Sequence, residues 1–190
     1  GACQSVFDEM KIIRQEPYTS ATVGSDTAIC GLEADLSSEY PIDGESWWEV
    51  AEGTGNIDDV NSTSPYVTEL SEGTNVFRWY NDNACAQPIY AEQTITVFNF
   101  IYADAGTDTS ILYNSFDPFP IGGDSAAYGG DGNYIYFWEN SAPIDDFEAA
   151  NPQVSFPDTG MYEFSLIVED GNNCVAYDTV NVHVELSDVL

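Results

Sequence analysis

The chain has 190 residues and carries 33 Asp and Glu against 3 Lys and Arg, which gives a formal net charge of −30. Three cations cannot form a basic surface. Nucleic acid is therefore excluded as a partner, and binding to anionic lipid is disfavoured. Hydrophobic residues make up 43% and aromatic residues 14%, too much for a disordered acidic tail, and no apolar run reaches the roughly 20 residues that membrane insertion requires.

Repetition is the strongest pattern in the sequence. Three stretches place a cysteine (Cys3, Cys85 and Cys174) on a turn that leads into an alternating apolar strand. An opening signature occurs twice, as Ala21–Ile29 and as Ala103–Ile111. Such a recurrence marks tandem modules. We therefore expect two complete modules, preceded by the last strand of another.

In chain order, residues 1–14 are the expected closing strand of a preceding module, residues 15–100 the first module and residues 101–190 the second. No segment has the period of a long amphipathic helix, whereas short alternating runs between Gly, Pro and Asn are typical of strands. In the first module these runs predict strands at Ala28–Ser37, Ser46–Val50, Tyr66–Thr68, Asn75–Tyr80 and Glu92–Phe98. In the second module they predict strands at Thr109–Tyr113, Tyr134–Glu139, Gln153–Phe156, Met161–Glu169 and Asp178–Glu185.

The two modules also match internally. Each has a Trp in the middle of a strand and a long alternating strand that follows a Gly turn. This order is typical of a β-sandwich, in which a central Trp fills the space between two sheets. The corresponding pairs are Trp48 with Trp138, Pro65 with Pro152, and Phe77 with Phe164.

The second module resembles a PKD-type immunoglobulin-like domain, and the first resembles a diverged member of the same family. The resemblance is carried by Gly129-Gly130-Asp131-Gly132-Asn133-Tyr134, Trp138, Thr159-Gly160-Met161-Tyr162 and Val168-Glu169-Asp170-Gly171. It implies an all-β chain of two tandem immunoglobulin-like (PKD-like) β-sandwich domains. Such modules occur in long cell-surface adhesins of Bacteroidetes, including the SprB-like gliding-motility adhesins, and beside the catalytic domains of secreted enzymes, so the resemblance implies an extracellular, cell-surface location.

Four cysteines allow three complete pairings. Cys30 lies on an early predicted strand and Cys85 on the closing hairpin of the same module, so we predict a disulfide between them. Cys174 corresponds to Cys85, but Leu112 and Tyr113 stand where its partner would be. Cys3 is expected to pair within the preceding module, and the spacing gives no support to a Cys3–Cys174 bond between copies. Reduced thiols are the alternative, although secretion favours disulfides.

Catalytic chemistry has little support in the sequence. His183 is the sole His and is expected to face outward on the last strand, where a surface role is favoured over a catalytic base. No second group completes an acyl-transfer triad, and no phosphate-binding Gly-Lys-Ser/Thr loop is present. Carboxylates are so numerous that pairs at glycosidase-like separations carry no signal. We predict that the chain is not an enzyme.

Calcium is the one cofactor that the composition suggests. Ca²⁺ takes six to eight oxygen ligands from carboxylates, amides and carbonyls. Asp82, Asp104 and Asp108 lie near the expected module junction and are the candidate ligands. The paired acids Asp58-Asp59 and Asp145-Asp146 lie in predicted loops. Ordinary Asx turns are the competing explanation for most of these residues.

Two further features suggest binding surfaces. Trp47 and Trp48 are adjacent, so strand alternation sends them to opposite faces. If Trp48 lies in the core, Trp47 faces outward and is a candidate for stacking on a sugar, with packing under a loop or against the next module as the alternative.

The strand that carries Val6, Met10 and Ile12 cannot bury its apolar face alone. Donation to a neighbour's sheet is its candidate role, with docking on the first module or disorder as alternatives.

The sequence therefore favours a non-catalytic repeat segment of a large secreted bacterial cell-surface adhesin that forms a stalk or filament. The expected partners are neighbouring modules of the same or an identical chain, and a surface polysaccharide. One alternative is a carbohydrate-binding accessory module of a secreted enzyme. The other is a filament subunit that assembles by strand donation.

Overall fold

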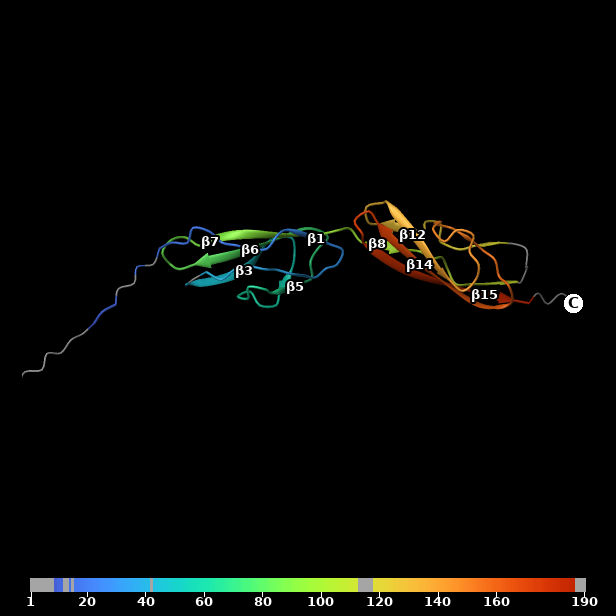
Figure 1. The fold of residues 1–190 in the computed structure, drawn as a ribbon, viewed down its shortest axis with the longest axis horizontal. Helices are drawn as coiled ribbons and strands as arrows, with labels where there is room; N and C mark the ends of the chain where they lie inside the picture. The colour runs from blue at the N-terminus through green and yellow to red at the C-terminus, as the bar shows by residue number, and fades with distance from the viewer. Residues whose placement is uncertain (1–8, 12–13, 15, 42, 113–117, 187–190) are drawn as a thin grey trace, which may run out of the picture. The chain divides into compact units, whose positions relative to one another are not determined.

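Strands, turns and loops make up the part of the chain that the computed structural model describes, which is residues 9–11, 14, 16–41, 43–112 and 118–186 (Figure 1). These residues form no helix that is long and apolar enough to cross a membrane. Contacts divide the chain into two units. The first comprises Gly1–Thr27 and Leu32–Thr96, and the second comprises Ala28–Gly31 and Val97–Leu190.

The first unit is a sandwich of two sheets. The larger sheet has the order β1 (Thr27–Ile29, of which the last two residues are grouped with the second unit), β7 (Ile89–Val97), β6 (Gly73–Asp82), β3 (Glu45–Glu52). The smaller sheet has the order β2 (Ala34–Asp35), β5 (Tyr66–Thr68), β4 (Asn56–Ile57). A side chain added at Gly55 would lie 2.8 Å from Val67 of β5 and 2.9 Å from Phe77 of β6. The two sheets therefore face each other, and Phe77 is fully buried between them.

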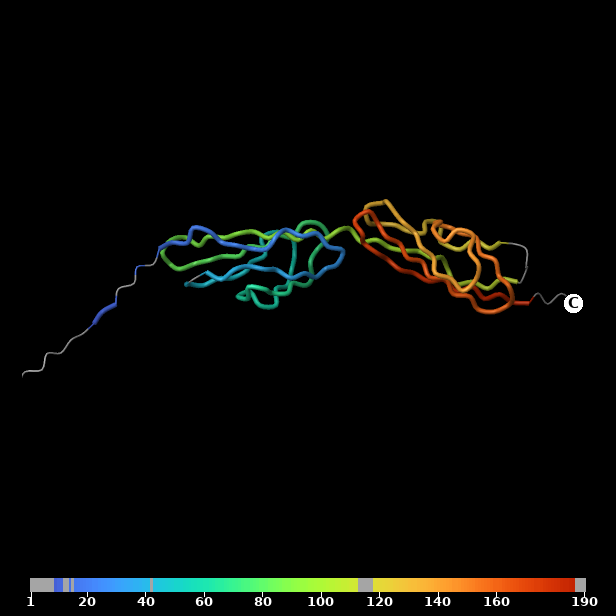
Figure 2. Tube along the Cα trace, viewed as in Figure 1, coloured from blue at the N-terminus to red at the C-terminus, as the bar shows by residue number. Residues whose placement is uncertain are grey.

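The second unit repeats this plan. Its main sheet has the order β12 (Tyr134–Asn140), β14 (Gly160–Asp170), β15 (Val175–Glu185), β9 (Thr109–Leu112), and β9 pairs with β15 in parallel. Two small sheets pair β11 (Ala127–Gly129) with β8 (Ile101–Ala103), and β10 (Phe119–Pro120) with β13 (Gln153–Val154). The tube in Figure 2 shows that most of each unit is extended chain that doubles back at turns. β8 lies close to β14 and β15, which places a small sheet beside the main one.

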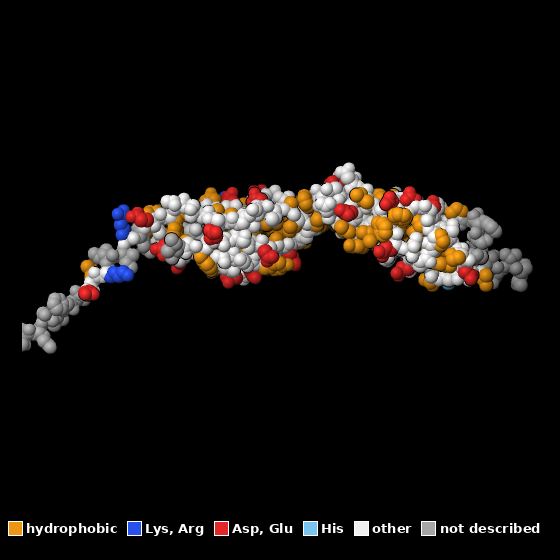
Figure 3. Space-filling model, viewed as in Figure 1, with side chains coloured by type: hydrophobic (Ala, Val, Ile, Leu, Met, Phe, Trp, Pro, Cys, Tyr) orange, Lys and Arg blue, Asp and Glu red, His pale blue; other side chains and the backbone are white. Residues whose placement is uncertain are grey.

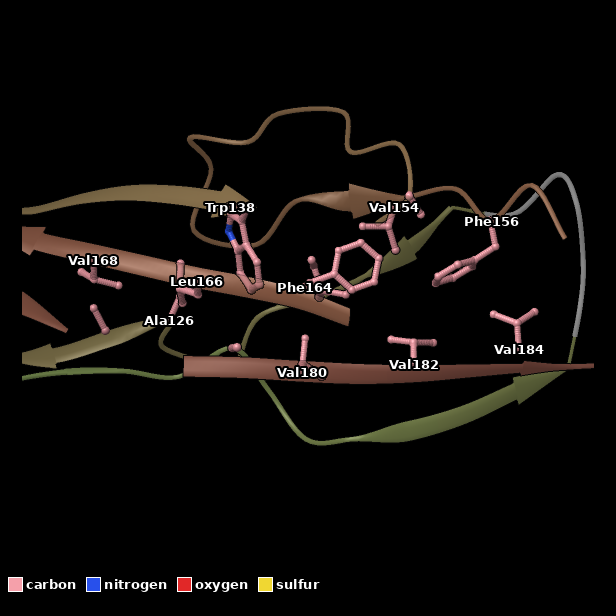
Figure 4. Close-up of a cluster of buried hydrophobic side chains, with 14 residues drawn as sticks. Ala126, Trp138, Val154, Phe156, Phe164, Leu166, Val168, Val180, Val182 and Val184 are labelled. Carbon is pink, nitrogen blue, oxygen red and sulfur yellow. The ribbon is translucent and has the colours of Figure 1, made fainter. Parts of the chain in front are cut away.

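One face of the long strands builds the core of the second unit. Over Phe164–Asp170 of β14 and Val180–Val184 of β15, buried residues alternate with half-buried ones, as a sheet with one fully covered face requires. Trp138 of β12 points into this core together with Phe164 and Leu166 of β14 and Val180 and Val182 of β15 (Figure 4). Burying a large apolar side chain contributes roughly 1.5–3 kcal/mol, so this layer is the main source of stability in the unit.

The two central tryptophans have the same surroundings in the two units, which confirms the internal match. Trp48 and Trp138 are each 2% exposed. The ring N–H of Trp48 donates to the carbonyl of Ser62 at 3.1 Å, and that of Trp138 donates to the carbonyl of Ala149 at 3.0 Å. The prediction of two tandem immunoglobulin-like β-sandwiches is therefore confirmed.

The proline pair has equivalent contacts as well. The carbonyl of Pro65 accepts a hydrogen bond from the amide of Leu36 at 3.0 Å, and the carbonyl of Pro152 accepts one from the amide of Ile121 at 3.1 Å. The strand predicted over Ala28–Ser37 is the one clear departure in the first unit. The chain bends after Ile29, so that β1 joins the larger sheet and β2 joins the smaller one.

Candidate functional site

Cys30 and Cys174 form a disulfide, with their Cα atoms 5.5 Å apart, within the range that such a bond allows. The predicted bond between Cys30 and Cys85 is therefore wrong, as is the expectation that Cys174 has lost its partner. Cys85 is exposed in the loop between β6 and β7. Cys3 lies outside the described residues.

The direction of β1 explains the error. The carboxylate of Asp26 accepts a hydrogen bond from the amide of Thr94 at 2.8 Å, and the carbonyl of Ile29 accepts one from the amide of Phe98 at 2.9 Å. The residue numbers increase together on the two strands, from Asp26 with Thr94 to Ile29 with Phe98, so β1 runs parallel to β7. Cys30, which follows β1, therefore lies near the end of β7. Cys85 precedes the start of this strand of 9 residues, which spans about 30 Å. A disulfide needs Cα atoms within about 7 Å, so the two sulfurs cannot meet.

Asp170 builds the turn that presents Cys174. The residue is 2% exposed. One oxygen accepts hydrogen bonds from the amides of Asn172 (2.9 Å) and Cys174 (3.0 Å), and the other accepts one from the amide of Asp131 (3.2 Å). Asp131 in turn accepts from Asn133, whose backbone and side-chain donors hold the pKa of Asp131 below its usual 3.8. Two acids that could have suggested a ligand site therefore fix two neighbouring turns.

The paired acids in the loops form the same turn in both units. Asp58 accepts hydrogen bonds from the amides of Asp59 at 2.7 Å and Tyr66 at 2.9 Å. Asp145 accepts them from the next residue at 2.7 Å and from Gln153 at 2.8 Å. The second aspartate of each pair accepts one from the amide two residues later. These are Asx-type contacts, in which a side chain holds the backbone of a turn.

The candidate calcium ligands are placed as follows. Asp82 lies at the end of β6 and Asp104 just after β8, and each accepts a hydrogen bond from the amide two residues along the chain, at 2.7 and 3.0 Å. Asp108 accepts one from the amide of Asn181 at 2.8 Å. Over the described ranges, no three His, Cys, Asp or Glu side chains form a group that could hold a metal ion. Calcium binding stays a prediction, and melting with excess chelator against millimolar Ca²⁺ tests it.

The sole histidine lies on the outer face of β15, as predicted. His183 is flanked by the buried Val182 and Val184, and its Nδ1 lies 3.1 Å from the carboxylate of Glu185. Its strand neighbours are Ser110 on β9 and Met161 on β14. The histidine therefore lies in the middle of the sheet, not at an edge.

Trp47 faces the opposite side of β3 from the buried Trp48, as strand alternation requires. Its ring stacks on that of Tyr80 in β6, with centroids 5.2 Å apart and an interplanar angle of 11°. Tyr80 contacts Tyr90 of β7 at 5.3 Å. The guanidinium of Arg78 lies 4.7 Å from the centre of the Tyr90 ring, a cation–π contact. We call these four side chains the aromatic row; it crosses three strands and fixes Trp47.

The sequence did not reveal two residues beside Trp47. Tyr40 is 65% exposed, yet its hydroxyl donates to the carbonyl of Asn61 at 2.7 Å and its ring contacts Trp79 edge-on at 6.2 Å. Tyr40 and Asn61 lie in separate loops that carry no motif. Their only sequence signal is their residue type.

The residues named for strand donation lie at the N-terminal end of the chain. Met10 is 83% exposed and has no assigned strand. Val6 and Ile12 lie outside the described residues. Strand donation therefore stays a prediction. Figure 3 shows Lys and Arg side chains near this end, and Asp and Glu spread over the visible face of both units between hydrophobic patches.

Comparison with known proteins gives structural likenesses at low identity. Neither a protein-family model nor a curated protein matches the chain. The solved PKD domain of the KIAA 1837 protein is 25% identical, with a TM-score of 0.39 over 46% of this chain and 89% of that one. The PKD domain of human KIAA0319 is 19% identical, with a TM-score of 0.36 over 48% of this chain and 86% of that one. The insect immune protein hemolin is 13% identical, with a TM-score of 0.46 over 86% of this chain and 46% of that one.

Proposed function

We propose that the chain is a non-catalytic repeat segment of a large secreted bacterial cell-surface adhesin, and that it serves as a tension-bearing part of a stalk or filament. The observation that carries the proposal is the bond between Cys30 and Cys174, which spans 144 residues. Stable structural disulfides are typical of oxidising, extracellular compartments. The repeated sandwich plan of the two units supports a role as a spacer built from similar modules.

The disulfide determines which residues bear a load. When the two ends of the chain are pulled, force runs from the N-terminal residues through β1 to Cys30, crosses the sulfurs to Cys174, and leaves along β15. The residues between the two cysteines form a closed loop that carries no tension. β15 has 11 residues that are already extended at about 3.3 Å each, near the maximum of about 3.6 Å. The loaded strand therefore cannot lengthen much, and most of both cores stays outside the load path.

Single-molecule pulling from the two chain ends tests this role. With the bond closed, only the 45 residues that precede Cys30 or follow Cys174 can extend, to about 150–160 Å at 3.3–3.6 Å per residue. Reduction should release roughly another 500 Å of chain.

Two variants control the pulling experiment. The double substitution Cys30→Ala with Cys174→Ala should give the long extension without reductant, whereas Cys85→Ala should keep the short one. Full extension of the oxidised wild-type chain would contradict the load path.

Strand donation from residues 1–14 is the alternative mode of assembly. The segment holds Lys11 and Arg14, two of the three cations in the chain, and an acidic neighbour would attract them. Sedimentation at high protein concentration tests the idea. A strict monomer excludes donation between copies, whereas an assembly that is lost when residues 1–14 are deleted supports it.

A further inference from the structure

Two open grooves lie side by side on the first unit and share Tyr40. One, of about 600 Å³, is lined by Tyr40, Glu45, Ser46, Trp47 and Asn61. The other, of about 300 Å³, is lined by residues 17–20, Thr22, residues 39–41 and Asn81. Ser46 and Asn81 line different grooves and are joined by a hydrogen bond of 2.9 Å. Both volumes fall in the range of small-ligand sites.

The aromatic walls of this site are held in place before any ligand arrives. Trp47 is fixed by its stack on Tyr80 within the aromatic row. The row is anchored at its far end by Arg78, whose side chain bonds the carboxylate of Glu92 at 2.8 Å. Tyr40 is held at both its hydroxyl and its ring. A rigid aromatic surface loses little entropy on binding, which favours affinity.

The polar groups that remain available are mainly acceptors. The carboxylates of Glu39 and Glu45 have no hydrogen-bond donor among the described residues. Asn61 donates through its side-chain nitrogen to the carbonyl of Ser46 at 2.9 Å, which leaves its side-chain oxygen to accept. The hydroxyls of Tyr18 and Tyr40 already donate, to Asp43 and to the carbonyl of Asn61.

This distribution of acceptors distinguishes between possible ligands. A proline-rich peptide also docks in aromatic grooves, but its carbonyls need donors. The ring N–H groups of Trp48 and Trp79 already donate to the carbonyls of Ser62 and Glu39, so the ring N–H of Trp47 is the indole donor that remains for such a peptide in the larger groove. Sugar hydroxyls can donate to carboxylates, and the apolar face of a pyranose ring can pack on Trp or Tyr. The net charge of −30 repels polyuronates and sulfated chains.

We propose that the two grooves joined at Tyr40 bind a neutral polysaccharide, with sugar rings on Trp47 and Tyr40 and sugar hydroxyls donating to Glu45 and Glu39. The site gives this segment an adhesive target of its own. It does not depend on the load path, because all the residues that carry it lie in the first unit and none is a cysteine. A failure of one proposal is therefore distinguishable from a failure of the other.

Affinity electrophoresis and calorimetry of the full chain test the site. The probes are soluble neutral β-glucan, mannan, galactan and chitin oligosaccharides, with polygalacturonate and oligolysine as the alternative chemistries. At least one neutral glycan should bind. Trp47→Ala should weaken its binding about tenfold, as loss of a Trp anchor does, and Glu45→Gln should weaken it by a smaller factor. Because Glu45 is exposed, the second variant keeps the test valid if Trp47→Ala does not fold.

Tyr128→Ala is the matched control. Tyr128 is 54% exposed and stacks on Tyr102 at 4.8 Å and 10°, much as Trp47 stacks on Tyr80, but it lines neither groove. Binding should stay within twofold in this variant. The proposal fails if none of the neutral glycans binds, if only polygalacturonate or oligolysine binds, or if Tyr128→Ala weakens binding as much as Trp47→Ala.

Discussion

Removing the Cys30–Cys174 bond should cost the protein a large share of its stability. We consider the double substitution Cys30→Ala with Cys174→Ala, which avoids leaving either thiol to react. In the chain-entropy model a closed loop of 144 residues restricts the unfolded chain by roughly 17 cal/mol/K, which is about 5 kcal/mol at 25 °C. This figure applies when the whole loop is unfolded. While either unit remains folded, the flexible part of the loop is shorter and the effect is smaller.

Denaturant unfolding followed by tryptophan fluorescence measures the effect. Trp48 and Trp79 report on the first unit, and Trp138 reports on the second, since all three are buried in their respective cores. The variant should unfold at a lower guanidinium concentration than the oxidised wild type. The largest shift should occur in the transition of the unit that unfolds last, because only then is the whole loop between the two cysteines unfolded. Wild type in reductant should behave like the variant.

Two results would refute this reasoning. One is an unchanged midpoint in the double variant, which would mean that the bond does not restrict the unfolded chain. The other is a non-reducing digest in which Cys30 is linked to Cys85. Such a peptide would restore the pairing inferred from sequence and would contradict the parallel placement of β1. Cys85→Ala should leave the Cys30–Cys174 peptide in the digest unchanged.

Three further predictions concern the buried Phe of each unit, the turn aspartate of each unit, and the carboxyl of Asp131. Phe77→Ala and Phe164→Ala each empty a fully buried site and should cost about 3–5 kcal/mol; each should lower the unfolding transition of its own unit, which calorimetry resolves. Asp58→Ala and Asp145→Ala should each cost about 1–2 kcal/mol, and unequal losses would contradict the shared turn. The pKa of Asp131 is lowered from 3.8 in the folded protein. Its carboxylate therefore stabilises the fold at pH values above its pKa in the unfolded chain, and this stabilisation is lost as the pH falls through its pKa in the folded protein. NMR titration should place the folded pKa below 3.8, and Asp131→Asn should remove this contribution to acid unfolding.

The fold was predictable because its signals are local and repeated. Alternating runs gave the long strands of both units, and the match of Trp48 with Trp138 gave the sandwich plan. The course of residues 28–37 was not predictable. An alternating run does not show that the chain bends after Ile29, or that β1 pairs in parallel with β7, because strand direction is decided by contacts far along the sequence. The disulfide prediction failed for that reason.

The candidate site was only partly predictable. Adjacent Trp47 and Trp48 implied one outward ring, and the structure places Trp47 there. Tyr40 and Asn61 join it from separate loops, and their positions depend on Trp79 and on backbone groups that no local pattern identifies. Likewise, the smaller groove exists because residues 17–20 and Thr22 lie beside Tyr40.

The acidic side chains fall into two groups once their partners are known. Asp58, Asp145 and Asp170 hold backbone amides in turns, so the fold accounts for them without a ligand. The carboxylates of Glu39 and Glu45 have no hydrogen-bond donor among the described residues, although they line grooves with the exposed Tyr40 and the half-buried Trp47, whose rings are held in place. An exposed ring that is held in place has lost entropy without the gain of full burial. Folding therefore explains the aspartates of the turns and leaves the groove unexplained, which is why the groove, and not the clustered acids, is the place to test for binding.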